Sequence, residues 1–174
     1  EAVLYLPGLL REFPSRGITF DAVHVGGVRN LLAVAAESGT TVRWLQMSAL
    51  GTREDAMTGY FRTKWQAEQL VRASHTDWTI FRPSVIFDDR SADRHNFVGE
   101  LAAVARQAPV LPIIGHGRYR LQPVSLDDVS QSFVQALSKP ETVHETYDMG
   151  GPEQLSYIEI IDRIALAMGK RKPH

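Results

Sequence analysis

The feature that most constrains the fold of this chain is a nearly strict alternation of strand-like and helix-like segments. Short runs rich in β-branched and aromatic residues predict strands, and apolar residues that recur at spacings of three and four predict helices. Such alternation is typical of a parallel sheet covered by helices on both faces. The predicted strands are residues 3–6, 42–47, 78–82 and 145–149, with an extended segment at 119–124, and the predicted helices are 21–38, 59–74, 96–107, one from 125, and 156–169.

Two helix ends carry clear local signals. Gly39 stands where a left-handed residue closes the helix that begins near Asp21. Ser156 and Glu159 have the spacing of a capping box, in which each side chain satisfies a backbone N–H at the start of a helix. The last helix is therefore predicted to begin after Ser156.

The composition is that of an ordinary globular domain, and it excludes several kinds of partner. The 174 residues are 44% hydrophobic and 22% charged, with a net charge of −1. A near-neutral chain lacks the concentrated positive field that nucleic acids or anionic membranes require, so neither partner is expected. No apolar run reaches the roughly 18 residues of a membrane span. The chain has no cysteine, which fits a reducing compartment, and a cytoplasmic location is predicted.

Tyr60 and Lys64 form the sharpest chemical signal in the sequence. Residues four apart share one face of a helix, so the phenol and the ammonium are expected to project together. A nearby cation favours the phenolate and is predicted to lower the pKa of Tyr60 toward the range of a general acid/base. The alternative is a helix with a half-buried tyrosine and a solvated lysine, and the pair alone does not distinguish the two.

Ser48 follows the strand at 42–47. Ligands of open α/β folds bind at the carboxyl ends of the strands. A serine hydroxyl at this edge can donate a hydrogen bond to a carbonyl oxygen whose negative charge grows as hydride arrives. The order of strand, Ser48, loop, Tyr60–Lys64 helix and strand makes a functional reading of these residues more plausible than any one of them does alone.

These motifs together resemble a known superfamily. Ser48, the run Y-F-R-T-K at 60–64, Glu68, W-T-I-F-R-P-S-V-I-F at 78–87, L-Q-P-V-S-L-D-D-V at 121–129 and Y-D-M-G-G-P at 147–152 are similar to the short-chain dehydrogenase/reductases. The resemblance is to the atypical and extended branch of NAD-dependent epimerases and dehydratases, and within it to the dinucleotide-binding accessory subunit of respiratory complex I and its bacterial relatives. It implies an α/β fold with a partial Rossmann-like, doubly wound parallel sheet and a small C-terminal substrate lobe.

The resemblance also implies roles for individual residues. Tyr60 is expected to be the acid/base and Lys64 to hold the ribose of the nicotinamide. Ser48 is expected to polarise the substrate carbonyl or hydroxyl. The remaining expected contacts of the cofactor, which is NAD or NADP, are Pro7, Gly8, Met47, Pro83, Ser84 and Val85.

Two departures from the superfamily pattern stand out. No G-x-G-x-x-G turn lies between a strand and a helix, although such a turn cradles the pyrophosphate in these proteins. The expectation is therefore a single domain over residues 1–174 that corresponds to the C-terminal two-thirds of the fold, with 84–125 and 145–174 contributing to the substrate lobe. The N-terminal Gly-rich half is expected to be missing from this chain. The second departure is Asp88, which stands where members of the superfamily often have a glycine.

Two functions remain open. The first is an NAD(P)-dependent oxidoreductase or epimerase-like enzyme that uses Ser48, Tyr60 and Lys64 on a small carbonyl or hydroxyl substrate. The second is a non-catalytic NAD(P)-binding protein, either a redox sensor of the NmrA type or an accessory or assembly protein of a respiratory complex. A homodimer is a further possibility. The six histidines have no metal-ligand spacing, so no metal site is expected.

Overall fold

A computed structural model describes residues 1–88, 97–107, 113 and 115–169. The chain forms two compact units. The first consists of Glu1–Pro83 and Gln131–Met149, and the second of Ser84–Ser130 and Gly150–His174. Within the described ranges, no helix is both long enough and apolar enough to cross a membrane.

A four-stranded parallel sheet forms the centre of the first unit, with the strand order β1-β2-β3-β7. Its strands are β1 (Ala2–Tyr5), β2 (Arg43–Met47), β3 (Asp77–Pro83) and β7 (Glu145–Met149), all within two residues of the predicted bounds. Because all four strands run in the same direction, their carboxyl ends meet at one edge of the sheet. The predicted site residues that come directly after the strands of this unit therefore lie at that edge.

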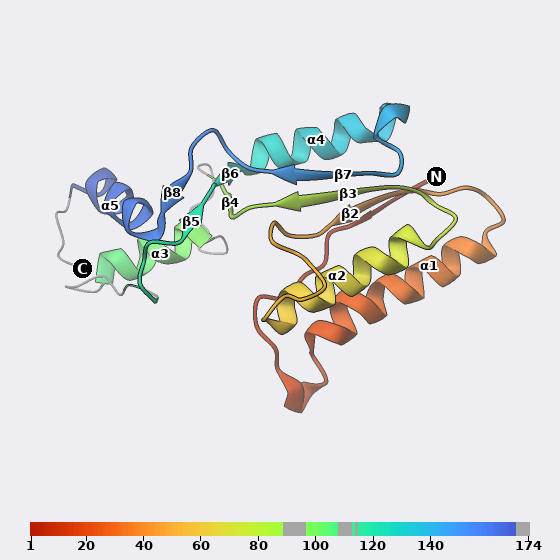
Figure 1. The fold of residues 1–174 in the computed structure, drawn as a ribbon, viewed down its shortest axis with the longest axis horizontal. Helices are drawn as coiled ribbons and strands as arrows, with labels where there is room; N and C mark the ends of the chain where they lie inside the picture. Colours follow the sequence, from red (N-terminus) through yellow and green to blue (C-terminus); the bar gives the residue numbers. More distant parts are fainter. Residues whose placement is uncertain (89–96, 108–112, 114, 170–174) are drawn as a thin grey trace. The chain divides into compact units, whose positions relative to one another are not determined.

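Helices cover both faces of this sheet (Figure 1). On one face lie α1 (Gly27–Glu37) and α2 (Gly59–Arg72), and on the other lies α4 (Leu126–Ser138). On the α4 side, the Phe133 ring packs against the Phe81 ring of β3, with their centroids 4.5 Å apart. Central strands buried on both faces explain why the neighbours Trp44 and Leu45 are both fully buried. The predicted α/β fold with a doubly wound parallel sheet is confirmed.

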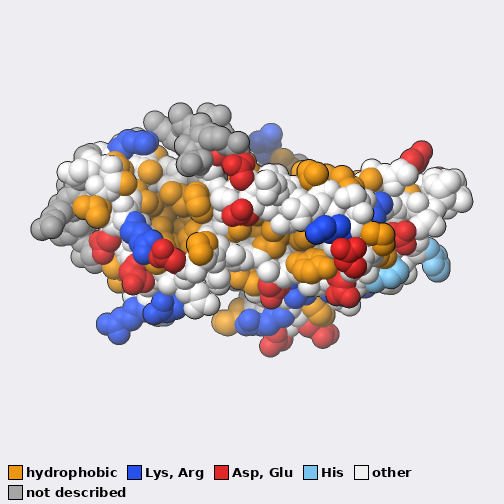
Figure 2. Space-filling view, turned by 90° about the horizontal axis from the view of Figure 1, so that it is seen from above, with side chains coloured by type: hydrophobic (Ala, Val, Ile, Leu, Met, Phe, Trp, Pro, Cys, Tyr) orange, Lys and Arg blue, Asp and Glu red, His pale blue; other side chains and the backbone are white. Residues whose placement is uncertain are grey.

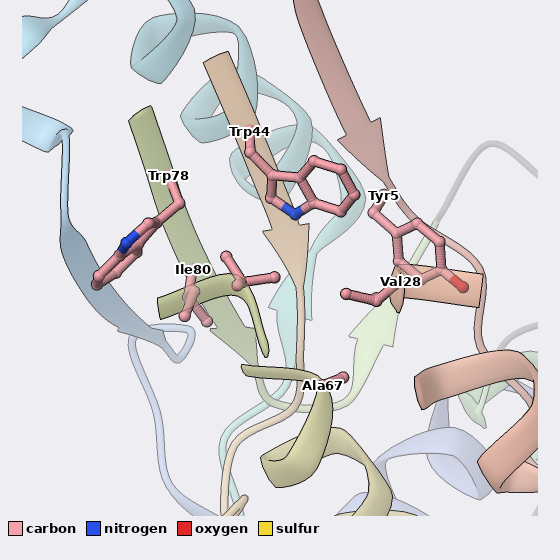
Figure 3. Close-up of a cluster of buried hydrophobic side chains, with 7 residues drawn as sticks. Tyr5, Val28, Trp44, Ala67, Trp78 and Ile80 are labelled. Carbon is pink, nitrogen blue, oxygen red and sulfur yellow. The ribbon is translucent and has the colours of Figure 1, made fainter. Parts of the chain in front are cut away.

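The core between the sheet and α1 and α2 is built from large strand side chains and small helix side chains (Figure 3). Tyr5 stacks on Trp44 with their ring centroids 6.1 Å apart. Val28 and Ala67 face these rings from the two helices. The small helix residues let both helices approach the aromatic layer of the sheet closely.

The helix that leads into α1 departs from the regular geometry predicted for it. Asp21–Gly26 forms a π-helical turn, in which the N–H of Gly27 bonds to the carbonyl of Ala22. The Tyr5 hydroxyl donates a hydrogen bond of 2.5 Å to the carbonyl oxygen of Val23 in this turn. A Cβ atom at position 27 would collide with the same hydroxyl. A side chain that bonds to a helix carbonyl in this way locally widens the helix.

The second unit contains α3 (Phe97–Gln107) and α5 (Tyr157–Ala167) with two short sheets. In these sheets β4 (Ile86–Phe87) pairs in parallel with β6 (Val124–Ser125), and β5 (Arg120–Leu121) pairs antiparallel with β8 (Leu155–Ser156). The extended segment predicted at 119–124 therefore divides between two sheets. Asn96, where the third helix was predicted to begin, lies outside the described residues.

Helix ends follow the local signals. Gly39 has a φ of 68°, the left-handed conformation predicted for it. Ser156 accepts from the N–H of Glu159, and the Glu159 carboxylate accepts from the N–H of Ser156, so the capping box of α5 is confirmed. The α4 helix exposes Val134 and Leu137. In a space-filling view, apolar side chains gather at the left of the visible face and lie among charged ones toward the right (Figure 2).

Candidate functional site

The predicted residues of the first unit lie where the parallel strands end. Ser48 follows β2, and its N–H donates to the carbonyl of Phe81 on β3 at 2.7 Å. Leu50 N–H donates to the carbonyl of Pro83 at 2.9 Å. These bonds extend the β2–β3 pairing past the end of β2 and fix the path of the Ser48 backbone.

Lys64 is a buried cation at this edge. Its side chain is 3% exposed, and its Nζ lies 3.1 Å from the carbonyl oxygen of Met47 and 3.4 Å from that of Pro7. A Cβ atom on Gly8 would lie 3.3 Å from this Nζ, so the ammonium packs directly against the Gly8 backbone. Burial lowers the pKa of Lys64 to about 8, and the charge of Glu68 opposes that shift.

Tyr60 lies one turn before Lys64, and its ring is packed edge-on against three others. The ring centroids of His24, Phe20 and Phe61 lie 5.4, 5.8 and 5.1 Å away. Burial raises the pKa of Tyr60, so the predicted lowering of this pKa is wrong. The loss of hydration disfavours the phenolate, and no hydrogen bond within the described ranges joins the hydroxyl to Lys64 or to Ser48. The phenol is therefore protonated at neutral pH and is a proton donor.

A buried ionic network joins Ser48 to α2 and β3. Ser48 Oγ donates to Glu68 Oε1 at 2.6 Å. Arg82 donates to both carboxylate oxygens of Glu68, from Nε at 2.8 Å and from Nη2 at 2.6 Å. Glu68 is fully buried. Ser48 Oγ also lies 3.4 Å from Thr52 Oγ1, but a hydroxyl has one proton and the bond to the carboxylate is much shorter. With that proton on Glu68, the serine offers lone pairs to any other group.

No role was predicted for Glu68 or Arg82 from the sequence. The sequence held a sign of this pair. Glu68 lies one turn after Lys64 on the same helix face. Arg82 follows two apolar strand residues, which are buried. A charge at such positions is costly unless it is paired. The missed pair is therefore a structural support of the site.

His24 is a third residue of the site that the sequence did not reveal. It is 1% exposed, and its ring nitrogens lie 3.1 Å from Leu9 N and 2.9 Å from Thr63 Oγ1. Burial first, and then the charge of Lys64, lowers its pKa to about 4, so the imidazole is neutral. Among the residues that the structure describes, no group of three His, Asp or Glu could hold a metal ion.

Ser84 and Val85 belong to the second unit. Ser84 Oγ accepts from the N–H of Gln122 at 3.2 Å, and the carbonyl of Val85 accepts from the N–H of Val124 at 3.0 Å. Both bonds order the start of that unit. In the first unit, the structure brings Lys64 against the backbones of Pro7, Gly8 and Met47, with Ser48 following Met47 directly and Tyr60 one helical turn away.

Two of the curated proteins to which this chain is similar differ in kind. The mitochondrial subunit 9 of the NADH dehydrogenase (ubiquinone) 1 alpha subcomplex of Arabidopsis thaliana is 29% identical over 153 residues, which cover 87% of this chain and 37% of that protein. A ceramide reductase of Caulobacter vibrioides is 25% identical over 140 residues, which cover 80% of this chain and 41% of that protein. The chain thus spans less than half the length of either relative.

A solved structure and a family model complete the comparison. The dTDP-glucose 4,6-dehydratase of Streptomyces venezuelae, solved with NAD bound, has a TM-score of 0.81 at 19% identity, with 98% of this chain and 58% of that chain covered. This likeness establishes the fold, which this chain shares with that dehydratase. The model of the RmlD substrate binding domain matches residues 53–174. The chain belongs to the RmlD substrate binding domain family.

Proposed function

We propose that this chain carries the tyrosine and lysine of an NAD(P)-dependent oxidoreductase or epimerase that acts on a carbonyl or hydroxyl substrate. The observation that carries the proposal is the buried ammonium of Lys64, held by the carbonyls of Pro7 and Met47 one turn from the Tyr60 phenol. Ionisable side chains with a pKa shifted by burial cluster at functional sites. The reductase and NAD-bound dehydratase among the proteins that this chain is similar to support the same chemistry.

The donors at this edge fit the ribose of a nicotinamide dinucleotide. An ammonium has three N–H donors, and within the described ranges two of them have carbonyl partners, which leaves one for a ribose hydroxyl. The Gly8 backbone has no side chain to block approach to Nζ. Pro7, Gly8, Met47, Pro83, Ser84 and Val85 are the further proposed contacts of NAD or NADP.

When bound, the dinucleotide supplies or accepts a hydride. Tyr60 then donates a proton to the substrate oxygen as that oxygen gains charge, or accepts one in the reverse direction. Lys64 stabilises the phenolate that proton donation leaves behind. Ser48 is proposed to contact the same substrate oxygen. Because its own proton points to Glu68, it accepts a hydrogen bond from a hydroxyl substrate, whereas polarising a carbonyl requires that proton to turn away from Glu68.

A second candidate is non-catalytic NAD(P) binding, in a redox sensor of the NmrA type or in an accessory subunit of a respiratory complex. Two observations favour it. The raised pKa of Tyr60 and the donation of the Ser48 proton to Glu68 are less suited to catalysis. Neither feature prevents these side chains from contacting ribose. One relative is a mitochondrial NADH dehydrogenase subunit, so association with a respiratory complex is proposed for this candidate. A homodimer remains the other proposed assembly.

The test uses the full-length protein and the Tyr60→Phe variant. NADH and NADPH affinity is measured by fluorescence titration, and turnover by oxidation of each nucleotide with a panel of ketones and aldehydes. We expect Tyr60→Phe to lose at least about a hundredfold in turnover, the contribution of a general acid, and to keep its nucleotide affinity. Tyr147→Phe, which removes another hydroxyl of the same unit, is expected to keep both.

Three other results would change the assignment. Turnover that survives in Tyr60→Phe would contradict the acid/base role. Nucleotide binding without turnover in the natural protein would favour the second candidate. A natural protein that binds neither NADH nor NADPH would contradict both candidates.

A further inference from the structure

His24 joins two segments that are far apart in the sequence. It lies on the π-helical turn before α1, and its Nε2 lies 3.1 Å from the backbone nitrogen of Leu9, in the loop that follows β1. Its Nδ1 lies 2.9 Å from Thr63 Oγ1 on α2. The buried ring therefore bridges the loop after β1 and the helix that carries Tyr60 and Lys64.

The partners of the ring specify its tautomer. The N–H of Leu9 can only donate, so Nε2 presents a lone pair and carries no proton. Thr63 Oγ1 lies 2.8 Å from the carbonyl oxygen of Gly59 and 3.1 Å from that of Tyr60, and it donates its own proton within α2. Its lone pair then accepts from Nδ1–H. Every group is satisfied only if the neutral imidazole carries its proton on Nδ1.

The bridge lies directly beside the proposed cofactor site. Gly8 precedes Leu9, and a Cβ atom on it would lie 3.3 Å from Lys64 Nζ and 3.9 Å from His24 Nε2. The side of Gly8 from which a Cβ atom would project therefore faces both the ammonium and the imidazole. The Tyr60 ring meets the imidazole edge-on at 5.4 Å, and the Phe20 ring stacks on it at 5.5 Å. Because Leu9 follows Gly8 directly, loss of the His24–Leu9 bond is expected to loosen the loop segment that lies against Lys64.

We infer that His24 is a positioning residue of this site, which as the Nδ1–H tautomer ties Leu9 to Thr63 and holds the Gly8 backbone against the Lys64 ammonium. The effect of His24 on dinucleotide binding rests on the proposed function, because the segment that His24 holds in place is the one proposed to contact the dinucleotide. The tie itself depends only on the contacts of His24.

Two amide variants separate the two ends of the bridge in the full-length protein. The terminal amide of glutamine reaches the position of Nε2, whereas that of asparagine reaches the position of Nδ1, and each can accept or donate. His24→Gln is expected to keep the Leu9 bond, and His24→Asn to keep only the Thr63 bond. His24→Leu keeps neither and serves as the control for the lost ring.

The first readout is the hydrogen exchange of the Leu9 amide, followed by NMR, because exchange measures the local opening of this bond. We expect protection in the natural protein and in His24→Gln, and at least about tenfold faster exchange in His24→Asn and His24→Leu, as for loss of one hydrogen bond. Nitrogen-15 spectra of the natural protein should show Nε2 without a bound proton. Equal protection in all variants, or a proton on Nε2, would overturn the inference.

The second readout is the affinity for NADH and NADPH, with the melting temperature measured alongside. Affinity should fall about tenfold in His24→Asn and His24→Leu and stay within about threefold in His24→Gln. If affinity instead follows the melting temperature across all three variants, His24 is a core residue and the positioning role is wrong. A natural protein that binds neither nucleotide contradicts the proposed function, and Leu9 exchange still decides whether the tie exists.

Discussion

Lys64 carries its charge in a place where hydration is largely lost. Its 3% exposed side chain and its pKa of about 8 mean that the folded protein loses this charge at a pH where an exposed lysine keeps it. Two carbonyls and the charge of Glu68 oppose this loss. A residue poised in this way titrates within the range of ordinary assays.

The affinity for dinucleotide should depend on pH through Lys64. Below pH 8 the ammonium is charged and can donate to ribose, and above pH 8 it progressively loses its proton. We expect affinity to be constant between about pH 6.5 and 7.5 and to fall above about pH 8. Fluorescence titration of the full-length protein measures this. Lys64→Met should bind weakly with no such step, and an equal step in that variant would assign the titration to another group.

His24 should contribute to the pH dependence of stability. Its pKa is lowered from 6.5 to about 4 in the folded state, so the unfolded chain binds the extra proton between these values. The contribution of neutral His24 to the free energy of unfolding is therefore fully present above pH 6.5 and is lost as pH falls toward 4. Between pH 7 and pH 5 the natural protein should lose about 2 kcal/mol more than His24→Gln.

Urea unfolding at the two pH values, followed by tryptophan fluorescence, measures this difference. All three tryptophans, Trp44, Trp65 and Trp78, belong to the first unit together with His24. A parallel loss of stability in the two proteins would show that His24 ionises normally in the folded state.

At the scale of elements, α2 carries the chemistry of the first unit on one face. Tyr60, Lys64 and Glu68 follow one another at intervals of four residues, so one stripe of the helix faces the sheet edge. The last of the three supports the others, because Glu68 joins the helix to Ser48 after β2 and to Arg82 on β3.

Removing the charge of Glu68 should be costly. Glu68→Gln leaves the Arg82 guanidinium, which is 18% exposed, without its carboxylate. Breaking a buried pair from one side typically costs about 3–5 kcal/mol. Urea unfolding should show a loss of that order, whereas the exposed Glu54→Gln should be nearly neutral. The double variant Glu68→Gln/Arg82→Gln should be more stable than the sum of the single changes predicts, and simple additivity would contradict the pairing.

The capping box of α5 offers a test in the second unit. Ser156→Ala removes the acceptor for the N–H of Glu159 and should destabilise that unit by about 1 kcal/mol. Ser156→Thr keeps the hydroxyl acceptor and should cost less. Thermal unfolding followed by circular dichroism is the appropriate measurement, since α5 belongs to a unit without tryptophan. Equal losses in the two variants would show that the cap is not the stabilising contact.

At the scale of the whole molecule, each unit is assembled from two separate stretches of chain. The chain leaves the first unit at Pro83, returns at Gln131 and leaves again at Met149. The parallel sheet depends on that return, because β7 pairs with β3 from more than sixty residues further along the chain. Tryptophan fluorescence therefore reports on the unfolding of one unit, and circular dichroism on both.

The sequence by itself determined the features that depend on local periodicity. The alternation of strands and helices, the left-handed Gly39, the capping box at Ser156 and the shared helix of Tyr60 and Lys64 were all predictable. Spacings of two and of three to four residues, together with cap chemistry, act over a few neighbouring residues and are visible in one segment at a time.

Only the tertiary structure decided the chemistry of the site. Burial raises the pKa of Tyr60, although the Lys64 spacing predicted the opposite. The Ser48 proton points to a carboxylate twenty residues away, and His24 bonds to Thr63 thirty-nine residues away. Desolvation and hydrogen-bond direction depend on which distant segments enclose a group, and no local pattern records that enclosure.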